Sequence, residues 1–258
     1  MKTSLSLGRL LILMLIKFEN PLLLSRVIDI LSELVTDVRI KITEFGVSIT
    51  AMDPANVSLV GFKLPKSAFT QFESDGKGEV LGVNLDNLKQ ILKRCSSVST
   101  LILEKKENSN TLDLIIQDKI KRNFSLTLIE IESEEKEIPN LEFSSKIELN
   151  SSDLVASIED CLVVSDACSF IVKNGKFIIE AKSLNSAKSE FSGDEAKIEA
   201  EDCRARYSLE YLIKFMKGAK LVERTVLKFG TDHPLRIDIK NDKLELIFIL
   251  APRVENED

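Results

Sequence analysis

The chain has 258 residues, of which 44% are hydrophobic and 29% charged. This is the balance of a folded globular protein rather than a disordered one, and the length allows about one to two domains. The formal net charge is −6. An acidic total disfavours indiscriminate binding of polyanions, although a local basic surface remains compatible with it.

Residue counts exclude several kinds of catalytic and metal site. The single histidine, His233, leaves little basis for a Ser/His/Asp triad or a Cys/His dyad. The four cysteines show no CxxC spacing, which disfavours a zinc knuckle, and their scarcity is typical of a reduced, intracellular protein. No GxGxxG or GxxxxGK[ST] motif indicates a nucleotide site. We expect a binding protein that is not an enzyme and uses no metal or cofactor.

The N-terminal segment carries Lys2, Arg9 and an apolar run from Leu10 to Ile16. The run is much shorter than the roughly 20 residues that span a membrane, and no small-residue cleavage site follows it. We therefore predict no membrane association, an N-terminal extension over residues 1–13, and a strand over Leu13–Phe18. Met14 is an alternative start of translation.

The first half then predicts two helices among antiparallel strands. Asn20 is expected to cap a helix that has Pro21 at its first position, and apolar residues at helical spacing follow to Leu34. Alternating apolar residues around the turn at Glu44–Gly46 predict a hairpin. Further elements are expected as a strand over 57–64, a helix over 85–95, and strands over 99–106, 111–118 and 121–131.

An acidic segment separates the two halves. Residues 130–137 hold five glutamates in eight positions, and Ile138 and Pro139 follow. Repelling like charges and a proline are typical of an extended, solvated connector, which we place at residues 132–140.

The second half repeats the order of elements. Ser151 and Ser152 begin a helix over about 152–163, and Asn174-Gly175 is a strong hairpin signal. A helix over 209–219 and strands over 225–232, 235–242 and 243–250 follow. The prediction is an α+β chain of two tandem similar domains, 14–131 and 141–253, each with antiparallel sheets packed on two helices, and a tail at 254–258.

Three segments carry a family resemblance: MDPANVSLV at 52–60, LGVNLDNLKQILK at 81–93, and residues 211–255, which end in LAPRVE. Together they resemble the proliferating cell nuclear antigen family of DNA sliding clamps, particularly archaeal-type subunits, and the resemblance covers about residues 14–258. It implies the DNA clamp fold and a head-to-tail trimer whose helices line a hole around duplex DNA. It also implies a processivity factor without chemistry of its own, in the cytoplasm with the nucleoid if archaeal and otherwise in the nucleus. The implied partners are double-stranded DNA without sequence preference, sister subunits, and DNA polymerase, flap endonuclease, DNA ligase and the clamp loader through short peptide motifs.

The resemblance places the basic side chains of three helices toward DNA. These are Arg26, Lys89, Lys93, Arg94, Lys214, Lys217 and Lys220. The alternative for each cluster is an ordinary solvated helix face. The third helix departs from the family pattern because it carries Glu159 and Asp160 and no basic residue, and Glu210 stands where an arginine is common. A mixed ring with sister subunits, or a clamp-like scaffold that needs them to encircle DNA, would explain this.

The resemblance also indicates a pocket for partner peptides. The matching positions are Met52, Val57, Leu59, Ile129, Ile131, Lys136, Ile138, Pro234, Ile249, Ala251 and Pro252. Apolar pockets suit the aliphatic and aromatic anchors of such peptides, although plain core packing is the alternative for each apolar residue. Lys136 departs from the aliphatic residue common in the family, and a charge at the rim would select partners by repulsion.

Ring closure is expected at two strands, about 119–128 and 187–192. Lys119, Lys121 and Arg122 mark the first, and Glu190, Asp194 and Glu195 mark the second. Opposite charges would steer head-to-tail contact, whereas ordinary charged edges prevent association.

Overall fold

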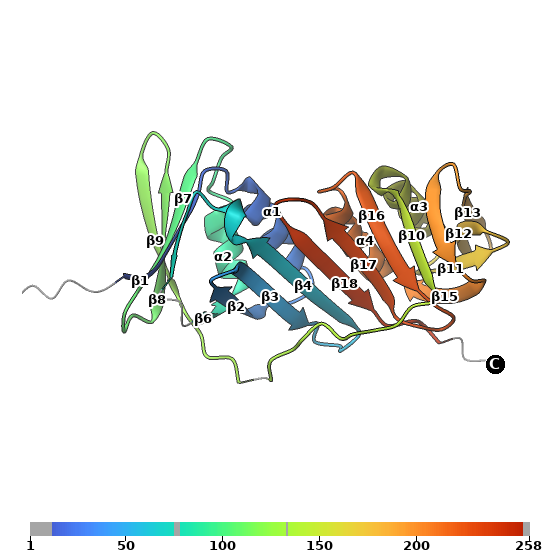
Figure 1. Ribbon diagram of the computed structural model, residues 1–258, viewed down its shortest axis with the longest axis horizontal. Helices are drawn as coiled ribbons and strands as arrows, with labels where there is room; N and C mark the ends of the chain where they lie inside the picture. The colour runs from blue at the N-terminus through green and yellow to red at the C-terminus, as the bar shows by residue number, and fades with distance from the viewer. Residues whose placement is uncertain (1–11, 75–77, 133, 255–258) are drawn as a thin grey trace, which may run out of the picture.

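The computed structural model describes residues 12–74, 78–132 and 134–254. Two repeats follow one another, each with the order strand, helix, five strands, helix and three strands, which confirms the predicted duplication (Figure 1). The first repeat contains β1 (Ile12–Phe18), α1 (Leu22–Leu31), β2 (Asp37–Thr43), β3 (Gly46–Met52), β4 (Ser58–Pro65), the short 3₁₀ helix η1 (Lys66–Ala68), β5 (Gln71–Ser74), β6 (Glu79–Asn84), α2 (Leu85–Leu92), β7 (Thr100–Lys106), β8 (Thr111–Gln117) and β9 (Lys121–Thr127). The second contains β10 (Ser145–Asn150), α3 (Ser151–Val164), β11 (Ala167–Lys173), β12 (Lys176–Lys182), β13 (Ser186–Phe191), β14 (Ala196–Ala200), β15 (Cys203–Ser208), α4 (Leu209–Ala219), β16 (Arg224–Phe229), β17 (Leu235–Lys240) and β18 (Glu245–Leu250).

Three antiparallel sheets hold these strands. Five strands of the first repeat form the sheet β5-β1-β7-β8-β9, and four strands of the second form β13-β12-β11-β15. The central sheet, β14-β10-β16-β17-β18-β4-β3-β2-β6, has nine strands drawn from both repeats. Its two parts join where β18 pairs with β4, from Glu245 opposite Lys63 to Leu250 opposite Ser58. The junction between the repeats is therefore a continuous hydrogen-bonded ladder.

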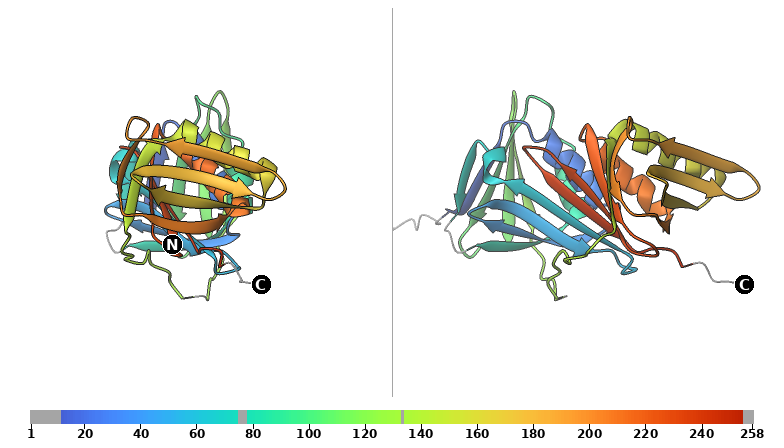
Figure 2. Two further views of the ribbon diagram at one scale, coloured as in Figure 1. Left: turned by 90° about the vertical axis from the view of Figure 1, so that its right-hand side faces the viewer. Right: turned by 45° about the vertical axis from the view of Figure 1, so that its right-hand side comes forward.

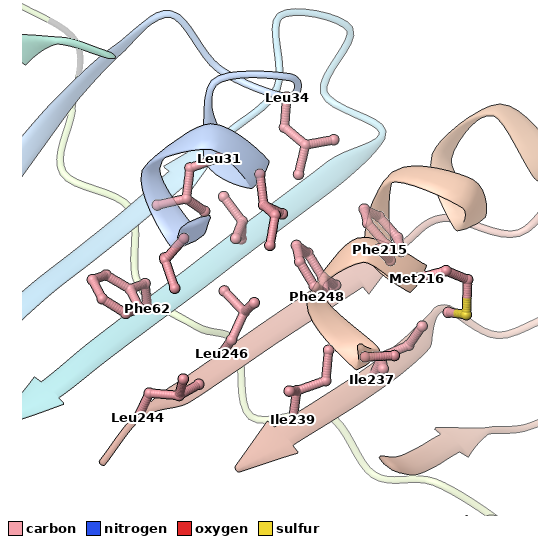
Figure 3. Packing of buried hydrophobic residues seen from close by; sticks show 14 of the residues in the cluster. Leu31, Leu34, Phe62, Phe215, Met216, Ile237, Ile239, Leu244, Leu246 and Phe248 are labelled. Atoms are coloured by element: carbon pink, nitrogen blue, oxygen red, sulfur yellow. The ribbon is translucent and has the colours of Figure 1, made fainter. Parts of the chain in front are cut away.

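The four helices lie side by side on one side of the central sheet. Contacts join α1 to α2, α1 to α4 and α3 to α4, which gives the order α2-α1-α4-α3 (Figures 1 and 2). One buried cluster fills the space between helices and sheets and continues across the repeat boundary. Figure 3 shows the boundary region, where Leu31 and Phe62 of the first repeat lie near Leu246 and Phe248 of the second. The ring of Phe215 stacks on Phe248 with centroids 4.3 Å apart.

The backbone follows local signals of the sequence at the turns and helix starts. Asn174 and Gly175 have φ of 52° and 72°, as a two-residue hairpin requires, and they join β11 to β12. Asn84 caps α2 through a 3.1 Å hydrogen bond that its side chain accepts from the Asn87 N–H. The expected cap at Asn20 needs correction. Pro21 is the capping residue, and the Asn20 side chain accepts instead from the Leu22 N–H at 3.3 Å.

Helix and strand bounds differ from the sequence expectations in places. The first helix ends at Leu31 rather than at about residue 34, and the second ends at Leu92 rather than at about 95. Five strands went unpredicted: β5, β6, β10, β14 and β15. Most of these strands have only four to six residues, and polar residues occupy alternate positions. Each strand therefore contains too few apolar residues to be recognised from the sequence. β1 begins at Ile12, so Ile12 and Leu13 belong to a strand; the rest of the predicted extension, residues 1–11, and most of the predicted tail lie outside the described residues.

The connector between the repeats is longer than the predicted 132–140. β9 ends at Thr127 and β10 begins at Ser145, and no strand or helix is assigned to the described residues between them. In Figure 1 this yellow-green segment runs along the outside of the central sheet. Of the helices in the described part of the chain, none combines the length and the apolar character that a membrane crossing demands.

Candidate DNA and partner interfaces

The helix layer carries nearly balanced charge. Within their bounds the four helices hold four basic side chains, Arg26, Lys89, Lys214 and Lys217, and six acidic ones, Asp29, Asp86, Asp153, Glu159, Asp160 and Glu210. Lys93, Arg94 and Lys220 add positive charge just beyond the helix ends. The expectation that Lys93 and Arg94 lie on the second helix is wrong, since Lys93 is its C-terminal cap. The lysines are therefore set among carboxylates.

Lys89 of α2 reaches across to α1. Its ammonium lies 2.8 Å from a carboxylate oxygen of Asp29 and 3.0 Å from the hydroxyl oxygen of Ser32. The hydrogen bond from Lys89 lowers the pKa of Asp29, although partial burial opposes this, and the same bond raises the pKa of Lys89. Lys93 approaches the same Asp29 oxygen at 3.8 Å. The carboxylate of Asp29 thus forms ion pairs with two of the predicted DNA-facing lysines.

The lysines of α4 have acidic partners on both sides. Lys217 is 2.5 Å from Glu33, which follows α1, and this ion pair crosses the repeat boundary. Lys220 is 3.2 Å from Glu159 of α3. Lys214 is 3.7 Å from Glu210 one turn earlier, and its ammonium lies 5.4 Å from the centre of the Tyr211 ring. Glu159 and Glu210, which the resemblance did not lead us to expect, therefore contact predicted DNA-facing lysines.

Two arginines complete the predicted DNA-facing set. Arg26 is exposed on α1. Arg94 is exposed after α2, and its backbone carbonyl accepts a 3.1 Å hydrogen bond from the guanidinium of Arg122. Both side chains are therefore accessible to solvent.

On the outer face of the central sheet, a second hydrophobic cluster brings together four of the predicted partner-binding residues. Leu59 of β4 and Ile249 of β18 are its buried members, and Met52 and Ile138 pack against them. Sequence reasoning missed two further members, Ile247 and Leu141. The missed signal for Ile247 is the run of β18, ELIFIL, which is apolar at every position after Glu245 and so indicates a strand covered on both faces.

The connector lies against this face at two glycines. A Cβ added to Gly61 of β4 would fall 2.5 Å from Cδ1 of Ile138. A Cβ added to Gly82 of β6 would fall 2.0 Å from the carbonyl oxygen of Ile129. The N–H of Ile129 also donates a 2.9 Å hydrogen bond to the carbonyl of Gly82. Ile131 packs beside Gly82. Ile129 and Ile131 therefore lie at the β6 edge of the sheet, apart from the cluster at β4 and β18.

Lys136 lines a groove of about 210 Å³ between the connector and strands β2 and β3. Met52 and Ile131 line the same groove, which links the edge residues to the outer cluster. Lys136 is exposed, while the neighbouring Glu135 forms an ion pair with Lys41 of β2. The predicted rim charge thus lies beside the groove.

The remaining predicted partner-binding residues lie elsewhere. Val57 packs against the main core, and its carbonyl accepts a 2.9 Å hydrogen bond from the Ala251 N–H. Pro252 follows Ala251 and is half-buried. Pro234 is half-buried at the start of β17, where its carbonyl oxygen lies 3.3 Å from Nδ1 of His233. None of these belongs to the outer cluster within the described chain.

The two strands expected to close a ring are both sheet edges. β9 ends the five-stranded sheet and β13 ends the four-stranded sheet. Their charges already have partners inside the subunit: Arg122 pairs with Asp118, and Glu190 lies 2.5 Å from Lys176 and 3.0 Å from Lys188. These pairs weaken the case for charge steering at the edges.

Duplicated halves, a layer of four helices and a central sheet shared between the halves define the DNA clamp fold. The family description "Proliferating cell nuclear antigen, N-terminal domain" matches residues 13–137. The DNA polymerase sliding clamp of Thermococcus gammatolerans is 37% identical over 246 residues, covering 93% of this chain and 98% of the relative, and that of Pyrococcus abyssi is 34% identical over 252 residues with the same coverage. The crystal structure of proliferating cellular nuclear antigen from Entamoeba histolytica matches with a TM-score of 0.87 and 26% identity, covering 95% of this chain and all of that one. The chain belongs to the proliferating cell nuclear antigen family.

Proposed function

We propose that this chain is a subunit of a DNA sliding clamp, a trimeric ring that encircles duplex DNA and tethers replication and repair enzymes without catalysing a reaction. Relatives named DNA polymerase sliding clamps are similar to it over nearly their whole length. The observation that carries the proposal is the pairing of β18 with β4, because the chain holds the parts for a second junction of the same kind.

β18 is the last strand of the second repeat, and β9 holds the same place in the first. β4 is the fourth strand of the first repeat, and β13 is the fourth strand of the second. Since β9 and β13 are both free edges, β9 of one copy can pair with β13 of the next by the geometry of the β18–β4 junction. Such a contact is head-to-tail, and head-to-tail contacts generate closed rings when the rotation closes.

The helices support the same assembly. At the junction inside the chain, α4 contacts α1. The equivalent contact between copies would place α2 against α3, because α2 corresponds to α4 and α3 to α1. Repetition of this contact makes a continuous inner wall of helices. A wall that presents Arg26, Lys89, Lys93, Arg94, Lys214, Lys217 and Lys220 to phosphates would hold DNA without reading its sequence.

The outer face supplies the partner site in this proposal. The cluster of Met52, Leu59, Ile138 and Ile249 and the groove beside Lys136 offer apolar contacts next to an extended connector. Ile129, Ile131, Val57, Pro234, Ala251 and Pro252 extend the site toward the sheet edge and the C-terminal segment. Short peptide segments of DNA polymerase, flap endonuclease, DNA ligase and the clamp loader are the proposed ligands. Because the similar sliding clamps from Thermococcus gammatolerans and Pyrococcus abyssi are archaeal, the proposed location is the cytoplasm with the nucleoid.

A second candidate is a clamp-like scaffold that encircles DNA only with sister subunits. The surplus of acidic over basic side chains within the helix bounds favours it. A wall of low positive charge would gain DNA affinity from subunits with more basic helices.

Retention on circular DNA tests both candidates. The purified chain is loaded with a clamp loader onto a nicked circular duplex, which is then purified and cut once. A ring of this chain alone stays on the circle and leaves after cutting, and light scattering gives the mass of three copies. The scaffold candidate is favoured instead if only mixtures with sister subunits are retained. A chain that stays on the cut DNA is held by adhesion, and this result would refute encirclement.

A further inference from the structure

Four lysines that face the proposed DNA path are held by carboxylates of a neighbouring helical segment. Lys89 and Lys93 meet Asp29, Lys217 meets Glu33, and Lys220 meets Glu159. In each pair the lysine belongs to α2, α4 or the residue just after, and the acid belongs to α1, α3 or the turn just after. The pairs bridge helices rather than successive turns of one helix.

The same position supplies an acid in both repeats. The Thr36 carbonyl accepts from the Leu85 N–H, and the Asp166 carbonyl accepts from the Leu209 N–H, so Thr36 and Asp166 are equivalent in the two repeats. Asp29 and Glu159 each lie seven residues before them. An acid at this position therefore contacts a lysine of the next helical segment in both repeats, although the contacted lysines are not at equivalent positions.

We propose that Asp29, Glu33 and Glu159 compete with DNA phosphates for the lysines of the second and fourth helices, and that this competition weakens phosphate contacts so that the ring slides freely. The inference rests on the proposed function, because it concerns DNA inside the ring. It gives a role to Glu159, whose presence on the third helix departs from the family pattern.

The competition follows from the geometry. A lysine ammonium that donates to a carboxylate at 2.5–3.2 Å must release that partner, or share it, before it contacts a phosphate. Surface ion pairs of this kind are weak, so the exchange between carboxylate and phosphate is close to balanced. Lys89 is held more firmly than the others because it also donates to Ser32 and is partly buried.

The matched variants are Asp29→Asn and Glu159→Gln, with Asp160→Asn as the control. Asp160 neighbours Glu159 on α3, is exposed, and makes none of the ion pairs between described residues. All three variants remove one negative charge from the helix layer. They differ in whether a lysine is released.

The measurement is one-dimensional diffusion of the labelled, loaded clamp on stretched DNA over a series of salt concentrations. Releasing a pair should slow diffusion by roughly 1.5- to 5-fold at low salt, which is the range of exposed ion-pair energies. It should also steepen the salt dependence of apparent DNA affinity by about 0.9 in the log–log slope for each additional phosphate that a lysine neutralises. The control should diffuse like the unaltered chain.

Two results would overturn the inference. Equal slowing by Asp160→Asn would mean that only total charge matters, and unchanged diffusion of Asp29→Asn and Glu159→Gln would mean that the pairs do not compete with DNA. Thermal unfolding of each variant shows whether it is folded, and the lysine-side variant Lys220→Gln gives an independent readout because it should speed diffusion. If even the unaltered chain is not retained on circular DNA with or without sister subunits, the proposed function itself fails.

Discussion

The phenol of Tyr211 on α4 donates a 2.7 Å hydrogen bond to a carboxylate oxygen of Asp53, which lies in the loop after β3 in the other repeat. Asp53 is 5% exposed and also accepts from the backbone N–H groups of Val57 at 2.8 Å and Ser58 at 2.6 Å. One side chain therefore orders the loop between β3 and β4 and connects that loop to the second repeat.

Replacing this phenol tests the connection between the repeats. Tyr211→Phe keeps the ring but leaves a largely buried carboxylate with one donor fewer. We expect the free energy of unfolding to fall by about 1–2 kcal/mol, measured by chemical denaturation. A double-mutant cycle with Asp53→Asn is the control, and additive losses would contradict a direct coupling.

The same bond has a pH signature. Burial opposes ionisation of Asp53, but the hydrogen bonds from Ser58, Tyr211 and Val57 outweigh it and lower the pKa of Asp53 below its ordinary value of 3.8. A lowered carboxyl pKa contributes stability above the unfolded value, and this contribution disappears as the pH falls through the folded value. The stability difference between the native chain and Tyr211→Phe should therefore shrink between about pH 5 and about pH 2. If the stability difference does not change with pH, the phenol acts through packing and not through the charge of Asp53.

Docking of the connector is predicted to depend far more on Gly82 than on Gly61. An added methyl at Gly82 meets the Ile129 carbonyl oxygen, which is backbone, whereas at Gly61 it meets the flexible end of Ile138. Gly82→Ala should therefore cost about 1–3 kcal/mol and Gly61→Ala less. Hydrogen exchange of the Ile129 amide, which donates to Gly82, measures docking. Equal protection in both variants would contradict this account.

The repeat was predictable from the chain because it depends on local signals, whereas the edge strands β9 and β13 were expected from the family resemblance. Asn174-Gly175 fixes a hairpin, and the order of helices and hairpins recurs in both halves. β10 and β15 were missed because strands of six residues with polar residues at alternate positions, such as SKIELN and CRARYS, resemble loops. Their burial depends on sheets that assemble from distant segments.

The candidate site was predictable in its residue types but not in its pairings. The family resemblance predicted Lys89 and Lys217 as DNA-facing residues, yet the linear sequence does not reveal that Asp29 and Glu33 lie within reach of them. Those contacts depend on how neighbouring helices pack against one another. The predicted set of partner-binding residues likewise lacked Leu141, because Leu141 reaches the outer cluster only through the path of the connector.

The inner-wall proposal predicts a salt effect. Lys89, Lys93, Lys214 and Lys217 changed together to Ala should weaken association of the clamp with DNA. The change should also flatten the salt dependence by about 0.9 in the log–log slope for each phosphate that is no longer neutralised. A matched set of exposed strand lysines, Lys63, Lys146, Lys197 and Lys240, serves as the control. An unchanged slope in the first set would move DNA contact to another surface.

Lys136 is predicted to select among partner peptides. It is exposed beside the groove between the connector and β3, so it should repel peptides with basic residues at the matching position. Lys136→Leu should raise the affinity of such peptides several-fold and change acidic peptides little or in the opposite direction. Lys136→Gln separates charge from shape, since it should behave like Lys136→Leu if charge decides. Titration calorimetry measures the affinities, and equal shifts for all peptides would refute selectivity.

The junction between copies makes a last prediction about Val163. Glu33 and Val163 each lie three residues before the equivalent Thr36 and Asp166, and Lys93 and Lys217 each lie eight residues after the equivalent Leu85 and Leu209. The Glu33–Lys217 ion pair of the internal junction therefore corresponds to Val163 of one copy near Lys93 of the next. Val163 is 88% exposed in the isolated chain.

Val163→Lys should weaken self-assembly because it opposes Lys93 with a like charge, while Val163→Glu should retain assembly or strengthen it by recreating the internal pair. Because exposed ion pairs contribute little energy, we expect the dissociation constants of the two variants to differ by roughly 1.5- to 5-fold at each junction. Light scattering over a dilution series measures it, and high salt should remove it because exposed charges are screened. Identical dissociation of the two variants at low salt would mean that copies of this chain do not meet at α2 and α3.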